Sequence, residues 1–133
     1  MPIELNHTIV HAYDRDGSAH FLADLFGLEV GPPYGHFLPV QTDNGVTLDY
    51  AGVGPDHEIA AQHYAFLVSE DEFDLIWGRI KDQGITYYPE PWMQNENEIN
   101  HNDGGRGLYF LDPSGHGMEI ITRPYGSGAQ YAD

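Results

Sequence analysis

The sequence contains no cysteine and few basic residues, and both scarcities exclude classes of function. Without cysteine the chain forms no disulfide and offers neither a thiolate zinc site nor a cysteine nucleophile. Five Lys and Arg residues stand against 21 Asp and Glu residues, which gives a formal net charge of −16. Because this charge repels phosphate backbones and anionic lipid headgroups, we expect no nucleic-acid partner and no membrane partner.

Long apolar runs are also missing. No stretch reaches the roughly 18 consecutive apolar residues that a membrane-spanning helix requires, and residues 1–7 have neither the basic start nor the apolar run of a secretory signal. We therefore expect a cytoplasmic protein. The chain does have 133 residues, of which 41% are hydrophobic, and eight histidines among its many acids. Length and hydrophobic content suit one compact domain, and imidazole with carboxylate is a ligand set for divalent transition metals.

The chain consists of two copies of one pattern of predicted elements. In each half a β-prone run precedes an amphipathic helix that glycine ends, and three further strands follow. Strands are expected at residues 5–10, 28–30, 37–41 and 46–50, then at 62–68, 85–88, 108–111 and 117–122, with helices around 21–26 and over 70–83. This pattern predicts one α+β domain over residues 1–133, made of two βαβββ modules. Module one is about 4–52, module two is about 61–124, and 125–133 is a C-terminal tail. Two such modules can pair their sheets into a curved mixed-sheet cup with a concave site.

Offsets between equivalent residues support the repeat. His63 follows His7 by 56 positions, whereas Glu119 follows Asp49 by 70. The increase of the offset from 56 to 70 positions indicates an insertion in the second module. The polar, Asn-rich segment 92–105 has about the required length. The two histidines therefore occupy the same place on the first strand of each module, and Glu119 lies on the last strand of the second.

Two histidines and one carboxylate on separate strands are able to hold a divalent metal. If both sheets face a common cavity, His7, His63 and Glu119 converge there, and a metal held by these three keeps positions open for water, substrate or dioxygen. We favour ligation over unrelated polar side chains, because two of the three occupy matching repeat positions. Asp49, at the repeat position of Glu119, is either a fourth ligand or a solvent-facing acid.

The segment 107–119, GLYFLDPSGHGME, resembles the closing motif of the vicinal oxygen chelate superfamily. That superfamily includes glyoxalase I, fosfomycin and bleomycin resistance proteins, and type I extradiol dioxygenases. His63 with YAFLV and His7 with TIV resemble the openings of its two modules, so the resemblance covers residues 4–124. It implies that His7, His63 and Glu119 are the metal ligands. It also implies a homodimer, in which His7 completes the site either of its own chain or of the other chain.

A finer resemblance concerns the extradiol dioxygenases. The spacing of His101, Tyr109 and Glu119 around the Asp-Pro-Ser-Gly turn is similar to their signature. In those enzymes the matching His and Tyr line the pocket and hydrogen-bond the catecholate, so the resemblance implies catalytic roles for His101 and Tyr109. Most extradiol enzymes differ in having four modules and a further active-site histidine, for which this chain offers only His57.

The leading hypothesis is a metal-dependent oxygen-chelate enzyme, specifically an extradiol-type dioxygenase. It would use Fe(II) or Mn(II) to cleave a catechol-like aromatic, a small molecule that binds through vicinal oxygens. A glyoxalase-type lyase or isomerase with Zn or Ni is the first alternative, and a metal-free binding protein like those of bleomycin resistance is the second. The scarcity of cations disfavours glutathione-linked and phosphonate substrates, because their anionic groups need Arg or Lys.

Overall fold

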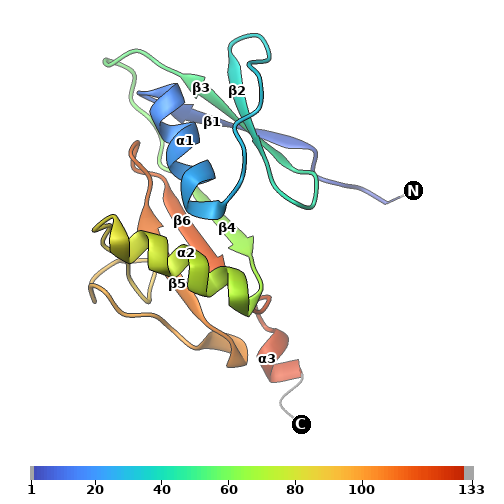
Figure 1. Cartoon of the computed structure of the whole chain (residues 1–133), viewed down its shortest axis with the longest axis vertical. Helices are drawn as coiled ribbons and strands as arrows, with labels where there is room; N and C mark the ends of the chain where they lie inside the picture. The colour runs from blue at the N-terminus through green and yellow to red at the C-terminus, as the bar shows by residue number, and fades with distance from the viewer. Residues whose placement is uncertain (1, 131–133) are drawn as a thin grey trace. The chain divides into compact units, whose positions relative to one another are not determined.

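The computed structural model describes residues 2–130, which form two compact units (Figure 1). Among these residues, unit 1 is 2–60 with the turn Asp112–Ser114, and unit 2 is Ala61–Leu111 with 115–130. No helix among the described residues is long and apolar enough to cross a membrane.

Unit 1 is a mixed three-stranded sheet with one helix. Its elements are β1 (His7–Ala12), α1 (Arg15–Phe26), β2 (Phe37–Gln41) and β3 (Thr47–Gly52). The strand order is β1-β3-β2, in which β1 runs parallel and β2 antiparallel to β3. The carboxylate of Asp14 caps α1 by accepting from the N–H of Gly17, and Gly27 ends the helix at a φ of 67°. The buried residues between α1 and the sheet include Val10, Leu22, Leu25, Val40 and Tyr50.

Unit 2 repeats this arrangement. Its elements are β4 (His63–Leu67), α2 (Glu70–Asp82), the 3-10 helix η1 (Asn102–Gly104), β5 (Gly107–Leu111), β6 (Gly117–Ile121) and α3 (Ser127–Gln130). The order β4-β6-β5 again combines one parallel and one antiparallel pair. Ser69 caps α2 through its hydroxyl, which accepts from the N–H of Glu72. The core of this unit includes Phe73, Ile76, Ile80, Phe110 and Ile120.

The strand register confirms that the two halves are copies of one pattern. In unit 1, Ile9 of β1 pairs with Asp49 of β3. In unit 2, Ala65 of β4 pairs with Glu119 of β6. The histidine that begins the first strand is His7 in unit 1 and His63 in unit 2. In each unit, the acid lies beside the residue two positions after that histidine. The predicted α+β fold with two modules is thus the observed one.

The predicted strands at 28–30 and 85–88 are wrong as strands. Each is reduced to one β-bridge, Val30 with Val40 and Tyr88 with Tyr109. The sequence after each bridge explains this, because Pro32 and Pro33 follow Val30 after one glycine and Pro89 follows Tyr88 directly. Proline lacks the N–H that a ladder needs, so neither strand continues. Each sheet therefore has three strands, and the others lie within two residues of their predicted bounds.

Candidate metal centre

The structure brings His63 and Glu119 together in unit 2. His63 begins β4, Glu119 lies in the middle of β6, and the two strands are parallel neighbours. The Nε2 atom of His63 is 2.8 Å from Oε1 of Glu119. The side chain of Glu119 is 1% exposed and that of His63 is 48% exposed. A buried carboxylate thus meets an imidazole that solvent and small molecules can reach.

The neighbours of His63 fix its position. Gly117 pairs with His63 across the two strands, and a Cβ atom at this glycine would lie 3.2 Å from Nδ1 of the imidazole. Behind them, the buried ring of His116 accepts a 3.0 Å hydrogen bond from the N–H of Gln62. The N–H of Gly117 in turn donates to the carbonyl of Gln62 at 2.8 Å. The residue before His63 is therefore held from two sides, and glycine leaves room for the ring.

Two tyrosines complete the surroundings of the carboxylate. Tyr109 of β5 pairs with Glu119, and its ring centroid lies 5.8 Å from that of His63. The hydroxyl of Tyr125 donates to Oε2 of Glu119, and the hydroxyls of Tyr125 and Tyr109 are 2.9 Å apart. Because the single hydroxyl proton of Tyr125 is directed at Glu119, Tyr109 is the donor to Tyr125. The hydrogen-bond chain therefore runs from Tyr109 through Tyr125 to the carboxylate.

Both phenols keep their protons in this environment. Burial raises the pKa of Tyr109 far above its ordinary value, and the hydrogen bond with Tyr125 and the nearby Glu119 raise it further. Burial also raises the pKa of Tyr125, as does its hydrogen bond to Glu119, while the bond from Tyr109 opposes the shift. Each tyrosine is consequently a neutral hydrogen-bond donor across the physiological pH range.

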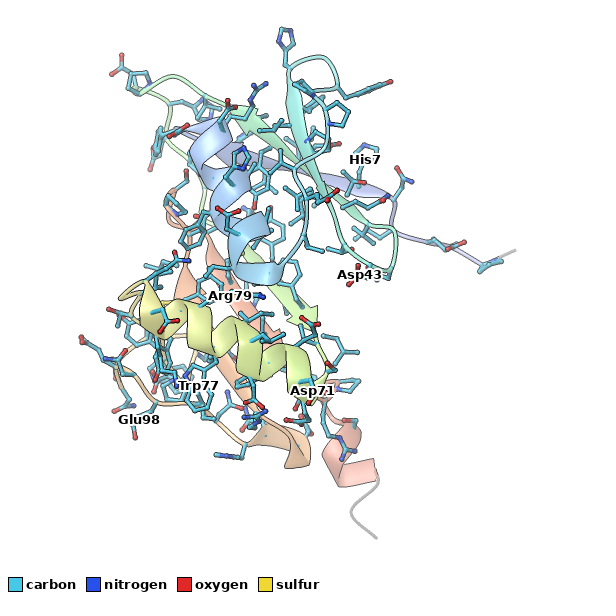
Figure 2. All side chains as sticks on the ribbon, viewed as in Figure 1. His7, Asp43, Asp71, Trp77, Arg79 and Glu98 are labelled. Atoms are coloured by element: carbon cyan, nitrogen blue, oxygen red, sulfur yellow. The ribbon has the colours of Figure 1, made fainter. Side chains whose placement is uncertain are left out.

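The remaining predicted site residues lie elsewhere in the chain. His7 is exposed at the start of β1 in unit 1, where its Nδ1 is 2.7 Å from Oδ1 of Asn6 (Figure 2). Asp49 is partly exposed on β3 of the same unit. His101 is exposed just before η1 and makes no hydrogen bond or ring contact with His63, Tyr109 or Glu119 in the described structure. As far as residues 2–130 are concerned, neither unit by itself contains three His, Asp or Glu side chains grouped to hold a metal.

Tyr125 is the site residue that sequence reasoning missed. The sequence placed it in the tail after the last strand, whereas its hydroxyl reaches Glu119 of β6. The only available signal was an aromatic residue directly after Arg123 and Pro124, six positions beyond the acid. That signal is too weak to distinguish a site residue from any exposed tyrosine.

The donor set of unit 2 fits a divalent metal. Two ligands that bind at right angles with bonds of about 2.1 Å have donor atoms about 3 Å apart. The 2.8 Å between Nε2 of His63 and Oε1 of Glu119 is close to that separation. Imidazole nitrogen and carboxylate oxygen suit Fe, Mn, Ni and Zn.

Comparison with known proteins gives three informative relatives, although no family model matches the sequence. The chain is 60% identical to the solved structure of Oxidase ChaP-H2, with a TM-score of 0.93 over 96% of this chain and 99% of that one. It is 54% identical to Oxidase ChaP-H1, with a TM-score of 0.90 over 94% and 99%. It is also 33% identical over 121 residues to the glutathione transferase FosA of Serratia marcescens, which covers 87% of this chain and 78% of that protein.

The chain belongs to the vicinal oxygen chelate superfamily. The predicted family resemblance is therefore confirmed. The names of the three relatives denote enzymes, two oxidases and one transferase, so the comparisons support an enzyme of the vicinal oxygen chelate superfamily.

Proposed function

We propose that the chain is a metal-dependent oxidase that binds a small aromatic substrate through two vicinal oxygens. The reaction that we favour is extradiol-type cleavage of a catechol-like ring. The observation that carries the proposal is the pair of His63 and buried Glu119, 2.8 Å apart on neighbouring strands. The two relatives named oxidases, at 60% and 54% identity, support oxidation over the other reactions of the superfamily.

His63 and Glu119 would hold the metal, with His7 as the third ligand. His7 would come from the same chain or from the other chain of a homodimer. Fe(II) or Mn(II) suits this nitrogen and oxygen donor set and the proposed oxidation. When bound, such a metal supplies Lewis acidity and redox chemistry to the chelated substrate.

Tyr109 would provide a proton donor beside the ligands. Its hydroxyl stays protonated because of burial, and its ring lies 5.8 Å from the ring of His63. The one proton of this phenol is directed at Tyr125 in the structure, so the hydroxyl would turn from Tyr125 to donate a hydrogen bond to negative charge that develops on a substrate oxygen. The extradiol-like spacing assigns His101 the role of a second proton carrier, on the exposed loop before η1.

Two of the five basic residues, Lys81 and Arg106, are engaged with other side chains, which disfavours the thiol-transfer chemistry in the name of FosA. Arg106 binds Glu70 through Nε and Asp74 through Nη1, both at 2.8 Å, and its guanidinium lies 4.5 Å from the centroid of the Phe73 ring. The ammonium group of Lys81 lies over Trp77. A phosphonate or a glutathione carboxylate needs cations that converge on the ligand, and these two are already engaged with α2.

The test is a metal titration followed by an oxygen-uptake assay on the whole chain. Protein loaded with Fe(II) without oxygen, and separately with Mn(II), is mixed with a panel of catechols. We expect oxygen consumption and a yellow ring-opened product. Glu119→Gln should weaken metal binding by about 100-fold and abolish uptake, while Glu29→Gln, which changes an exposed acid, should do neither.

Two outcomes would contradict this proposal. Turnover of a glutathione hemithioacetal without oxygen uptake would favour the glyoxalase-type lyase or isomerase. Tight aromatic binding with no bindable divalent metal would favour a metal-free binding protein.

A further inference from the structure

The segment after β6 places a tyrosine hydroxyl on the second oxygen of Glu119. Before this tyrosine, the N–H of Thr122 donates to the carbonyl of Arg106 at 2.9 Å. After it, the hydroxyl of Ser127 donates to the carbonyl of Pro124 at 2.6 Å. The N–H of Gly128 also donates to Oδ1 of Asp103 in η1 at 3.3 Å. The segment is therefore held on both sides of Tyr125.

The ring of Tyr125 contributes little to the core. Tyr125 is 62% exposed, yet its hydroxyl is bonded to a carboxylate that is 1% exposed. Its hydroxyl is also bonded to that of Tyr109, which is 5% exposed and lies on β5 opposite Glu119. An exposed ring with a hydroxyl that two buried groups engage indicates that the hydroxyl is the part of the residue that matters.

We propose that Tyr125 is a positioning residue for Glu119. By occupying Oε2, its hydroxyl holds the carboxylate in the orientation that directs Oε1 at Nε2 of His63 and at the metal. This inference rests on the proposed function, in which Glu119 is a ligand. The terminal torsion of glutamate is broad, so packing alone does not fix the rotation of the carboxylate plane and the direction of the oxygen that would bind the metal. The hydrogen bond from the restrained hydroxyl of Tyr125 does fix this orientation of the carboxylate.

The hydrogen bond from Tyr109 restrains the hydroxyl of Tyr125 that binds Glu119. Tyr109 belongs to the same sheet as Glu119, where the two residues pair, and its hydroxyl lies 2.9 Å from that of Tyr125. Groups that orient a ligand in this way typically contribute 10- to 100-fold to metal affinity. Loss of the hydroxyl would leave a buried oxygen without its donor and free the carboxylate to turn.

The test compares Tyr125→Phe with wild type in the whole chain. Mn(II) affinity is measured by calorimetry, and the Mn(II) environment by electron paramagnetic resonance. We expect the dissociation constant to rise about 10- to 100-fold and the spectrum to change. The midpoint of thermal unfolding of the metal-free protein should fall modestly, because a buried oxygen loses one donor. Tyr34→Phe is the matched control, because it removes a hydroxyl from a residue that is 78% exposed in unit 1.

The outcomes separate this inference from the proposed function. If wild type binds Mn(II) and Tyr125→Phe binds it equally tightly or more tightly, the positioning role is overturned and the metal site stands. A lowered melting midpoint with unchanged Mn(II) affinity also overturns it, because the role of Tyr125 is then structural. If wild type binds no Mn(II), the metal site and the positioning role both fail.

Discussion

Gly117 occupies a position where a larger residue would disturb His63. It pairs with His63 in the parallel β4–β6 ladder, and the imidazole lies over the space that a side chain would fill. Its backbone does not require glycine for conformational reasons, since its φ is outside the left-handed region. The requirement is the space for the ring, which links this residue to the geometry of the proposed metal centre.

We expect Gly117→Ala to weaken metal binding without unfolding the protein. The new methyl carbon would lie 3.2 Å from Nδ1 of His63, so the ring must move by a few tenths of an ångström relative to Glu119. Metal–ligand distances hold to within about 0.2 Å, which is less than this shift, and we therefore expect metal affinity to fall about tenfold. Calorimetric titration with Mn(II) measures the affinity, and circular dichroism checks the fold.

Gly54→Ala is the control for this substitution. A Cβ atom at Gly54 has no other atom within 4 Å, apart from its chain neighbours, so this change should leave Mn(II) affinity unchanged. Wild-type affinity in Gly117→Ala would mean either that the ring moves aside at no cost or that His63 is not a ligand. A crystal structure of the variant would distinguish these two explanations.

At the scale of elements, local sequence determines most of what was predictable. Helix α2 follows from the apolar spacing of Phe73, Ile76 and Ile80 and from the acids of its first turn. The equivalent placement of His7 and His63 follows from counting positions along the repeat. The strands predicted at 28–30 and 85–88 do not form, because proline follows each β-bridge and interrupts the ladder.

The rest of the site depends on contacts that no local pattern specifies. The hydrogen bond from Tyr125 to Glu119 requires the path of the segment after β6, which Pro124, Ser127 and Gly128 determine through their hydrogen bonds. The role assigned to His101 came from spacing alone and is still a prediction. Spacing along a sequence indicates which residues share a strand, but it does not indicate where a loop side chain points.

The loop between α2 and β5 is organised around one carboxylate. Glu90, which is 9% exposed, accepts hydrogen bonds through Oε1 from the N–H groups of Gln94 at 2.9 Å and Asn95 at 3.1 Å. Its Oε2 accepts from the side-chain amide of Asn95. Burial opposes ionisation of Glu90, but these hydrogen bonds outweigh it and hold the pKa of the carboxyl below its ordinary value of 4.5.

This shift predicts how the stability of the protein depends on pH. A carboxyl whose pKa is lower in the folded state stabilises that state fully above the unfolded pKa, and the stabilisation is lost as pH falls through the folded pKa. Glu90→Gln should therefore lower the free energy of unfolding at pH 7, and the difference from wild type should shrink below pH 4.5. Urea unfolding at several pH values between about 7 and 3 measures it.

Glu98→Gln is the matched control, because Glu98 is an exposed acid of the same loop (Figure 2). It shows what the loss of one negative charge does without the loss of the hydrogen bonds at Glu90. A difference between Glu90→Gln and wild type that stays constant down to pH 3 would contradict the assigned role of the carboxylate.

At the scale of the whole molecule, each unit has an edge strand that begins with a candidate ligand. The strand β1 lies at one edge of its sheet and begins with His7, and β4 lies at one edge of its sheet and begins with His63. Both strands carry exposed apolar side chains, since Ile9 is 48% exposed and Leu67 is 61% exposed. Edge strands with apolar side chains favour association. These features support the proposed homodimer, in which His7 would complete the site either of its own chain or of the other chain.

A mixture of two inactive variants should regain activity if His7 crosses between chains. His7→Ala lacks one ligand and Glu119→Gln lacks another, so each homodimer has two incomplete sites. In a mixed dimer, one site combines His7 of one chain with His63 and Glu119 of the other, and all three are intact. Random exchange at equal concentrations makes half of the dimers mixed, with one complete site of two, so about a quarter of wild-type oxygen uptake should return. If His7 serves its own chain, no mixing ratio restores uptake, because every site then keeps the defect of its own chain.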